Sequence, residues 1–356
     1  MRLLLVIAEM VPGGAERIVI QLAGDAVDRG DDVMVATAGG AWLPELEATG
    51  ADVELVAFQK RAALPTAMSV GRLATLLRRF RPDLVHTHNA RVTVATRLAM
   101  LLSGRRQVPL LTTLHGLAPE DYGAAAKLLR ATRATVIACA PSVGRSLTAA
   151  GFPAGRTKVV MNGAALDPAG PARGAAMRAR LGLGEGPVVA GIGRLVPQKS
   201  WSTLVEAAAQ LPDVQFVVAG DGPLRDDLVA QAAAGAGRVQ FPGVVDDVAA
   251  LLGIAACVTA TSVWEGLPLS LLEALSLGRP AVVTAVDGIT DVVPEHAALL
   301  VPPGDPSALA RGLKRVLADD ELAAALGREA RRAATTWSPA TMLQAYRDAY
   351  AAARHS

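Results

Sequence analysis

Two glutamates lie close together in one short stretch that could bind a ligand. Glu265 and Glu273 are separated by seven residues. The apolar run 255–260 before them predicts a buried strand, and the run 269–277 predicts a helix that ends at Gly278. Backbone N–H groups at a helix N-terminus bind anions, and a carboxylate further along the helix can accept hydrogen bonds from hydroxyl groups. The stretch therefore suits a ligand that joins an anion to a polyol, as a sugar nucleotide does, although two solvated helix-end charges remain the alternative.

Two cations stand in a similar strand–turn–helix segment earlier in the chain. Residues 188–192 predict a strand and residues 201–209 a helix, and Arg194 and Lys199 lie in the turn between them. Arginine offers phosphate oxygens a planar fork of donors, and lysine offers a mobile point charge. Two cations beside a helix start suit a pyrophosphate, and ordinary surface charges are the alternative.

Glycine-containing turns follow several other predicted strands. Gly13 and Gly14 follow the first one, but the turn is not Gly-x-Gly-x-x-Gly, so a dinucleotide fingerprint is unsupported. Gly220 and Gly222 follow a strand in the second half, and Val245 lies in the turn after the next strand. We expect the backbone of these later turns to line a pocket for a nucleotide base.

Three histidines lie at the ends of predicted strands. His86 and His88 are two positions apart and therefore share a face, but a metal site would need a third ligand that the sequence does not supply. His115 stands beside Gly116 at the carboxyl end of a strand, where parallel sheets place chemistry. The position alone leaves open whether His115 is a site residue or a loop residue.

Composition and length limit the class of protein. The chain has 356 residues, 51% hydrophobic and 19% charged, which suits an α/β protein of two domains. We expect the N-terminal run to form the first buried strand rather than a signal peptide, and no apolar run is long enough to span a membrane. Cys139 and Cys257 lie in apolar runs and predict buried thiols of a cytoplasmic protein.

Charge is distributed unevenly along the chain. The net charge is +2, but basic residues outnumber acidic ones in the first 160 residues and the reverse holds afterwards. Six arginines of the first half could face an anionic acceptor or a peripheral anionic membrane surface: Arg72, Arg78, Arg79, Arg81, Arg105 and Arg106. Ordinary scatter of surface charge is the alternative. A pI near 8.7 and 3% aromatic residues argue against nucleic-acid binding.

Predicted strands and helices alternate along the whole chain, which is typical of parallel sheets covered on both faces. We therefore predict an α/β protein with two Rossmann-like, doubly wound domains. Residues 1–162 with 338–356 would form the first domain, residues 163–186 a linker, and residues 187–337 the second domain.

The chain resembles the retaining, GT-B-fold glycosyltransferases of family 4, also called glycosyl transferases group 1, along nearly its whole length. The matching blocks stand in the family's order: 13–16, His88, 115–116, 162–163, 193–199, 220–223 and 265–273. The resemblance implies two domains that face each other across a cleft, with the last helix returning to the first domain. It also implies a bacterial protein of polysaccharide biosynthesis.

The resemblance assigns roles to single residues. Arg194 and Lys199 would neutralise the leaving diphosphate, Glu273 would bind the ribose, and Glu265 and His115 would contact the donor sugar near its reacting carbon. Gly14 would close the diphosphate site from the first domain. The remaining implied contacts to the donor come from Gly13, Asn162, Gly193, Gly220, Gly222, Val245, Gly266, Leu267, Leu269 and Ser270. Backbone N–H groups of this loop can bind sugar hydroxyls, and many relatives have a residue other than proline at position 268. Pro268 has no backbone N–H, so the identity of the hexose stays open.

The implied activity is transfer of a hexose or N-acetylhexosamine, with retention, from a nucleotide diphosphate sugar to a hydroxyl group. UDP is the favoured carrier and GDP the second. The acceptor would be a glycan, a lipid-linked precursor or a small molecule. Since the sequence contains no Asp-x-Asp triplet, we expect neither a metal nor another cofactor. The alternatives are a GT-B-fold sugar-nucleotide 2-epimerase and a catalytically silent sugar-nucleotide-binding protein.

Overall fold

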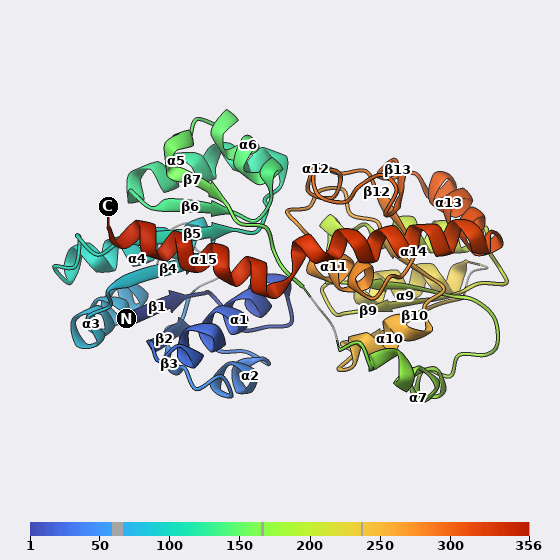
Figure 1. Ribbon diagram of the computed structural model, residues 1–356, viewed down its shortest axis with the longest axis horizontal. Coiled ribbons are helices and arrows are strands. Elements are labelled where there is room, and N and C mark those ends of the chain that lie inside the picture. The colour runs from blue at the N-terminus through green and yellow to red at the C-terminus, as the bar shows by residue number, and fades with distance from the viewer. Residues whose placement is uncertain (59–66, 165–166, 236–237, 356) are drawn as a thin grey trace. The chain divides into compact units, whose positions relative to one another are not determined.

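The computed structural model describes residues 1–58, 67–164, 167–235 and 238–355. The chain divides into two compact units (Figure 1). Unit 1 comprises residues 1–162 and 339–356, and unit 2 comprises residues 163–338. Each unit is built on its own parallel sheet, as the alternation of predicted strands and helices requires.

Unit 1 contains a seven-stranded parallel sheet in the order β3-β2-β1-β4-β5-β6-β7. The strands are β1 (Arg2–Val6), β2 (Asp32–Thr37), β3 (Asp52–Leu55), β4 (Leu84–His88), β5 (Leu110–Leu114), β6 (Thr135–Ala138) and β7 (Thr157–Val159). Central strands such as β4 and β5 are buried throughout, as expected where helices cover both faces of a sheet. The helices are α1 (Gly14–Asp28), α2 (Leu43–Glu47), α3 (Ala67–Phe80), α4 (Ala90–Leu102), α5 (Tyr122–Thr132), α6 (Pro141–Ala149) and α15 (Pro339–Arg354).

Unit 2 contains a six-stranded parallel sheet in the order β10-β9-β8-β11-β12-β13. The strands are β8 (Val188–Ile192), β9 (Gln215–Ala219), β10 (Arg238–Gly243), β11 (Cys257–Ala260), β12 (Ala281–Thr284) and β13 (Leu299–Val301). The helices are α7 (Gly174–Arg180), α8 (Trp201–Ala208), α9 (Arg225–Ala234), α10 (Val248–Ile254), α11 (Leu269–Ser276), α12 (Asp287–Thr290), α13 (Pro306–Ala318) and α14 (Asp320–Ala334). None of the helices in the described ranges is both long enough and apolar enough to cross a bilayer.

Residues 163–186, for which a linker was expected, belong to unit 2. Residues 165 and 166 lie outside the described ranges. Residues 170–180 pack on α10, and the absence of a Cβ at Gly170 allows the close approach, since one placed there would lie 2.1 Å from the Cβ of Ala249. An ion pair of 2.6 Å between Arg173 and Asp247 holds the same contact.

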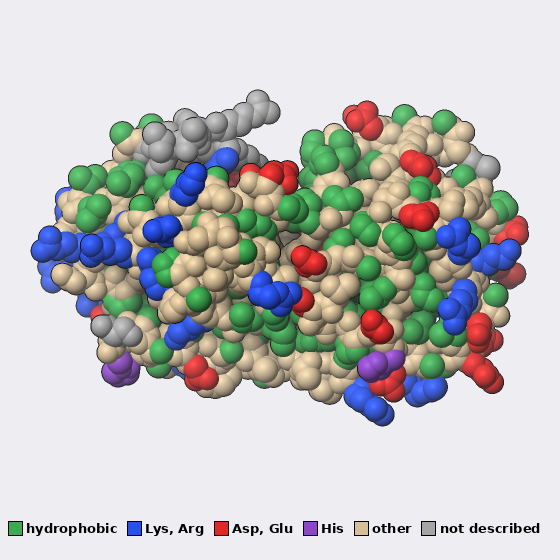
Figure 2. All heavy atoms as spheres, turned by 90° about the horizontal axis from the view of Figure 1, so that it is seen from above, with side chains coloured by type: hydrophobic (Ala, Val, Ile, Leu, Met, Phe, Trp, Pro, Cys, Tyr) green, Lys and Arg blue, Asp and Glu red, His purple; other side chains and the backbone are tan. Residues whose placement is uncertain are grey.

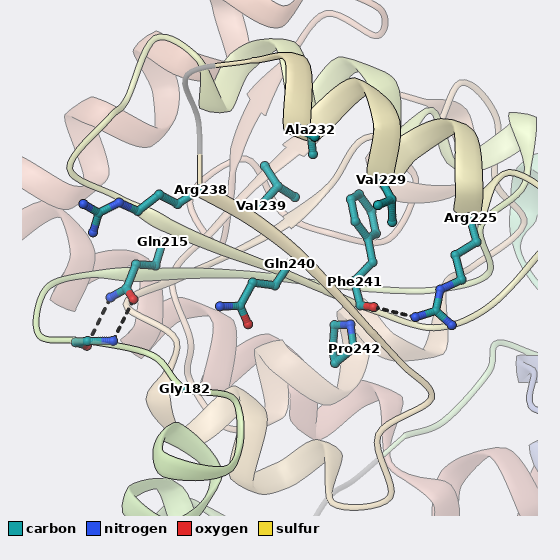
Figure 3. A pocket seen from close by; sticks show the side chains of 12 residues that line it. Gly182, Gln215, Arg225, Val229, Ala232, Arg238, Val239, Gln240, Phe241 and Pro242 are labelled. Carbon is teal, nitrogen blue, oxygen red and sulfur yellow. Dashed lines mark hydrogen bonds between the residues drawn. The ribbon is translucent and has the colours of Figure 1, made fainter.

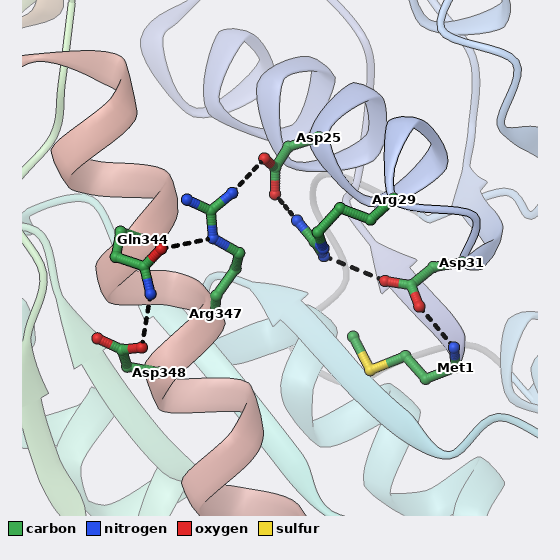
Figure 4. A network of polar contacts seen from close by, with 7 residues as sticks. All are labelled: Met1, Asp25, Arg29, Asp31, Gln344, Arg347 and Asp348. Carbon is green, nitrogen blue, oxygen red and sulfur yellow. Dashed lines mark hydrogen bonds and ion pairs between the residues drawn. The ribbon is translucent and has the colours of Figure 1, made fainter.

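Helix α15 packs on unit 1, although the whole of unit 2 separates it from the rest of that unit in the sequence. Arg347 of α15 forms an ion pair of 2.8 Å with Asp25 of α1 (Figure 4). Asp25 also pairs with Arg29, which in turn reaches Asp31 at 3.1 Å. This row of charges ties the last helix to the first helix of the chain.

Candidate active site

The cations predicted to bind a pyrophosphate lie at the carboxyl end of β8. Arg194 is exposed, and its backbone carbonyl accepts a hydrogen bond of 3.0 Å from the indole N–H of Trp201, the first residue of α8. Lys199 ends a short 3-10 turn, 197–199, just before α8. The loop thus presents one solvent-facing guanidinium and one lysine next to a helix start.

The turn after β9 packs directly on this loop through backbone atoms. A Cβ at Gly220 would lie 2.1 Å from the carbonyl oxygen of Gly193, and one at Gly222 would lie 2.4 Å from that of Leu195. The backbone N–H of Leu195 donates a hydrogen bond of 2.9 Å to the carbonyl of Asp221. Glycine is therefore required at both positions so that the two turns can form one continuous backbone surface.

Glu265 follows β11, the other neighbour of β8 in the sheet, and contacts Lys199 directly. The ammonium of Lys199 and the carboxylate of Glu265 form an ion pair in which only 14% and 6% of the side chains are exposed. Ser262 donates a hydrogen bond of 2.6 Å to the same carboxylate oxygen. Gln198 donates one of 3.1 Å to the carbonyl of Trp264. Glu265 is thus held as a buried, paired anion beside the predicted phosphate site.

Hydrogen bonds to backbone carbonyls hold residues 261–266 against the Lys199 turn. The hydroxyl of Thr261 donates a hydrogen bond of 2.7 Å to the carbonyl of Lys199, and the N–H of Val263 donates one of 2.9 Å to that of Gln198. Thr284 at the end of β12 donates another of 2.6 Å to Ser262. Three strand ends therefore meet around one carboxylate and one ammonium.

Helix α11 starts directly after this loop. Its N-cap is Pro268, which makes no side-chain capping bond. The hydroxyl of Ser270 donates a hydrogen bond of 2.9 Å to the carbonyl of Ile192 in β8. Leu267 and Leu269 bury their side chains, so only their backbone groups can meet a ligand. Glu273 is half-buried one turn into the helix.

Val245, predicted to line the base pocket, lies after β10 at the edge of the same sheet, with its side chain in a hydrophobic core. Its backbone therefore remains as the part that can face a ligand. The predicted residues of unit 2 thus follow the carboxyl ends of β8 and three further strands, β9, β10 and β11.

The candidate residues of unit 1 follow β1, β5 and β7. Gly13 is the N-cap of α1 and Gly14 its first residue, after the loop that follows β1. Asn162 is buried beyond β7. His115 is half-buried after β5, and its Nε2 lies 3.0 Å from Nδ1 of His88 at the end of β4.

Burial keeps His86, His88 and His115 neutral. It lowers the pKa of His86 to about 3 and that of His115 to about 4. Burial and the neighbouring rings hold the pKa of His88 well below its ordinary value. In the described ranges, no group of three or more His, Cys, Asp or Glu side chains is arranged to hold a metal ion.

Comparison with known proteins assigns the chain to a family. Residues 175–333 match the family described as Glycosyl transferases group 1, and residues 12–167 match Glycosyltransferase Family 4. A 2-deoxystreptamine N-acetyl-D-glucosaminyltransferase from Streptomyces fradiae is 30% identical over 355 residues, which cover 87% of this chain and 83% of that protein. The chain belongs to the group 1 glycosyltransferases. This confirms the resemblance seen in the sequence blocks.

Other proteins are similar to this glycosyltransferase either in part of the sequence or in the whole fold. A 2-deoxystreptamine glucosyltransferase of Streptomyces kanamyceticus is 37% identical over 171 residues, so the match spans 44% of either protein. The crystal structure of Anabaena Alr3699/HepE in complex with UDP and glucose is similar with a TM-score of 0.86 and 25% identity, over 99% of this chain and 100% of that one. The predicted GT-B architecture of two parallel-sheet, Rossmann-like domains is confirmed.

Some contacts in the candidate site were not predicted from the sequence. Ser262 and Gln198, which hold Glu265, were not singled out, and neither was the pairing of His88 with His115. A hydroxyl three residues before a predicted acidic ligand was an available signal for Ser262. No sequence signal was available for contacts between residues of different strands, because these contacts depend on the order of the strands in each sheet.

A cavity of about 800 Å³ lies away from these residues, beside the edge strand β10 (Figure 3). Its walls include Arg225, which donates a hydrogen bond of 3.2 Å to the carbonyl of Phe241, and Gln215, which is bonded to Gly184. No predicted site residue lines it. The chemistry of the paired ions, rather than the size of a cavity, therefore locates the candidate site of unit 2.

Proposed function

We propose that this protein is a retaining glycosyltransferase that moves a hexose or N-acetylhexosamine from a UDP-sugar to a hydroxyl group of an acceptor. The observation that carries the proposal is the contact between Lys199 and Glu265 at the end of the second sheet, beside Arg194 and two glycine turns. Cations and a backbone surface suit the diphosphate, and carboxylates suit the sugar hydroxyls.

The choice of UDP is supported by a similar protein. Anabaena Alr3699/HepE was solved with UDP and glucose and with UDP-glucose. The nucleotide base would meet backbone groups near Val245 rather than a charged side chain, and such groups do not by themselves select one base. GDP therefore remains the second candidate.

The proposed reaction breaks the bond between the anomeric carbon and the diphosphate oxygen and forms a bond from the acceptor oxygen on the same face of the sugar. Arg194 and Lys199 stabilise the charge that develops on the departing diphosphate. A phosphate oxygen accepts the proton of the acceptor hydroxyl. Glu265 binds the donor sugar rather than attacking it, because its carboxylate is held by Lys199 and Ser262. Glu273 binds the ribose and His115 a hydroxyl of the donor sugar.

In this proposal the protein's own cations take the place of a divalent ion. Transfer should therefore persist in the presence of EDTA and should not increase when Mg²⁺ or Mn²⁺ is added. Loss of transfer on chelation, with recovery on adding back a metal, would refute this part of the proposal.

The acceptor is proposed to be a glycan, a lipid-linked precursor or a small molecule. A peripheral contact with the anionic, cytoplasmic face of a membrane is supported by the end of α4, where Leu98, Leu101 and Leu102 are 43%, 51% and 61% exposed. Arg78 donates a hydrogen bond to the carbonyl of Leu102, and Arg106 lies in the loop beyond. Figure 2 shows Lys and Arg side chains gathered at the left end of the view, beside hydrophobic ones. Apolar side chains with a basic rim suit an anionic lipid surface.

Sedimentation with vesicles tests the membrane contact. We expect binding to vesicles that contain anionic lipid, loss of binding at high salt, and weaker binding of Leu101→Ser with Leu102→Ser. Equal binding to neutral vesicles, or no binding at all, would remove the contact from the proposal.

The central experiment screens sugar nucleotides and their diphosphates for thermal stabilisation and then measures transfer with the best donor. Arg194→Ala and Lys199→Ala should each lower kcat/KM by about 10²–10³. Lys314→Ala, an exposed lysine of α13, is the matched control and should behave as wild type. Transfer near the wild-type rate in either site variant would overturn the assignment.

Incubation with the donor alone separates the other two functions. A 2-epimer formed without an acceptor would identify an epimerase. Stabilisation by a donor without transfer, hydrolysis or epimerisation would identify a catalytically silent binding protein.

A further inference from the structure

A row of three histidine rings crosses the carboxyl end of the first sheet. His86 and His88 point to the same face of β4, with ring centroids 4.5 Å apart. The rings of His88 and His115 are nearly parallel, with centroids 5.3 Å apart. His86 and His88 are fully buried, whereas His115 is half-buried at the open end of the row.

The first ring of the row is fixed by the last helix of the chain. Nδ1 of His86 lies 2.7 Å from the hydroxyl of Tyr350, and Nε2 lies 2.8 Å from that of Thr113. Thr113 in turn lies 3.1 Å from the hydroxyl of Tyr346. Both nitrogens of His86 are therefore used, and its ring forms a fixed wall against which His88 packs.

His88 has a hydrogen-bond partner for only one of its nitrogens. Nδ1 lies 3.0 Å from Nε2 of His115, and within the described ranges Nε2 of His88 is buried without a partner. Since burial keeps both rings neutral, one proton lies between them. Either His88 donates from Nδ1 and leaves a bare nitrogen at its Nε2, or His115 donates from Nε2 and leaves a buried N–H of His88 without an acceptor.

The two arrangements differ in what they leave unpaired in the interior. Buried N–H groups without an acceptor are rarer in proteins than acceptors without a donor, since an orphaned donor bears the full cost of its desolvation. The arrangement in which His88 donates from Nδ1 is therefore favoured. His115 then accepts at Nε2 and carries its own proton on Nδ1.

We propose that His88 is a positioning residue that fixes His115 as the Nδ1–H tautomer, so that His115 presents a hydrogen-bond donor to an oxygen atom of the ligand. The inference rests on the proposed function only in taking that ligand to be the donor sugar. It assigns a chemical role to each nitrogen of His115. Nε2 is occupied by His88 and cannot act as a base, and Nδ1–H is the group left to bind a sugar hydroxyl.

The tautomer can be measured without any substrate. Nitrogen-15 NMR of protein labelled at histidine distinguishes a protonated from a bare ring nitrogen, and His115→Gln identifies the signals of His115. In the wild type we expect a protonated Nδ1 and a bare Nε2 on His115. A proton on Nε2 of His115 in the wild type would overturn the proposal.

Two variants of His88 separate positioning from folding. His88→Asn places an amide donor near the position of Nδ1 and should keep the tautomer, whereas His88→Ala should release it. We expect His88→Ala to lower kcat about tenfold, the effect of one lost hydrogen bond, with the donor KM changed by less than about threefold, and His88→Asn to restore most of the rate. His296→Gln, an exposed histidine, is the control.

The outcomes distinguish the two proposals. If the wild type transfers no sugar but has the expected tautomer, the proposed function fails and the positioning of His115 stands. If transfer occurs and His88→Ala leaves both the tautomer and kcat unchanged, the positioning role fails. Should His88→Ala not fold, the wild-type spectrum and the His88→Asn variant decide the question.

Discussion

Gly288 lies against the carbonyl group of Gly266, so that a Cβ at position 288 would come within 2.0 Å of that oxygen. The same Cβ would lie 2.5 Å from the carbonyl oxygen of Glu265. Helix α12 thus supports the loop that carries the buried carboxylate of the candidate site, and only glycine leaves room for that loop.

Gly288→Ala should therefore displace the Glu265 loop. We expect a loss of transfer of about tenfold or more and a lower melting temperature, since the clash is with backbone atoms that cannot rotate away. Steady-state kinetics and thermal unfolding measure both effects. Gly123→Ala in α5 is the control, because nothing lies within 4 Å of a Cβ there. Unchanged kinetics in Gly288→Ala would mean that the loop does not need its observed position.

Glu265→Gln should have opposite effects on nucleotide binding and on transfer. The ammonium of Lys199 now pairs with Glu265, and a diphosphate would compete for it. Without the carboxylate, we expect UDP alone to bind about threefold to tenfold more tightly, while kcat falls because the sugar loses a contact. Calorimetry with UDP and initial rates with the donor give the two numbers. The exposed Glu206→Gln in α8 should change neither, and weaker binding of UDP to Glu265→Gln would contradict the competition.

The buried histidines predict that acid destabilises the protein. Burial lowers the pKa of His86 from 6.5 to about 3, so between these values the unfolded chain binds a proton that the folded chain does not. Stability therefore rises with pH across this window and is lost as the pH falls below about 6.5. Urea unfolding at pH 7, 6 and 5 should show this loss, with a shallower slope for His86→Gln. Equal slopes in the variant and the wild type would place the acid sensitivity elsewhere.

Two tyrosines of α15 should differ in their contribution to stability. Tyr350→Phe leaves Nδ1 of the buried His86 without its hydroxyl partner, which costs about 1–3 kcal/mol. Tyr346→Phe removes a contact of Thr113, whose hydroxyl keeps its contact with His86, so the cost should be smaller. Urea unfolding gives the free energy of unfolding of the two variants. Each variant serves as the control for the other, because both rings are buried on one helix. A larger loss for Tyr346→Phe would refute the network as described.

The sequence predicted those features that depend on local patterns. Apolar runs located the strands, and glycines and cations after them located the loop of Arg194 and Lys199, because in a parallel sheet ligand groups follow strand ends. The contact of Lys199 with Glu265 could not be read in this way. It depends on β8 lying beside β11, an order that is set by the packing of the whole sheet.

Composition alone does not distinguish a linker from a packed segment at residues 163–186. The segment is rich in alanine, glycine, proline and arginine, which is typical of a linker. In the structure the same glycines allow close packing, since a Cβ at Gly174 would lie 2.8 Å from the side chain of Ile254. Small residues indicate either flexibility or tight contact, and only the partner surface decides between them.

The discontinuous make-up of unit 1 sets an order for its completion during synthesis. Residues 1–162 leave the ribosome first, yet the tyrosines that cover His86 belong to α15, which is translated after all of unit 2. The sheet made first therefore stays incomplete, with His86 uncovered, until the 163–338 segment has been synthesised. That segment is continuous in sequence and can fold as a unit in the meantime. The part of the enzyme that begins folding earliest is thus the part that finishes last.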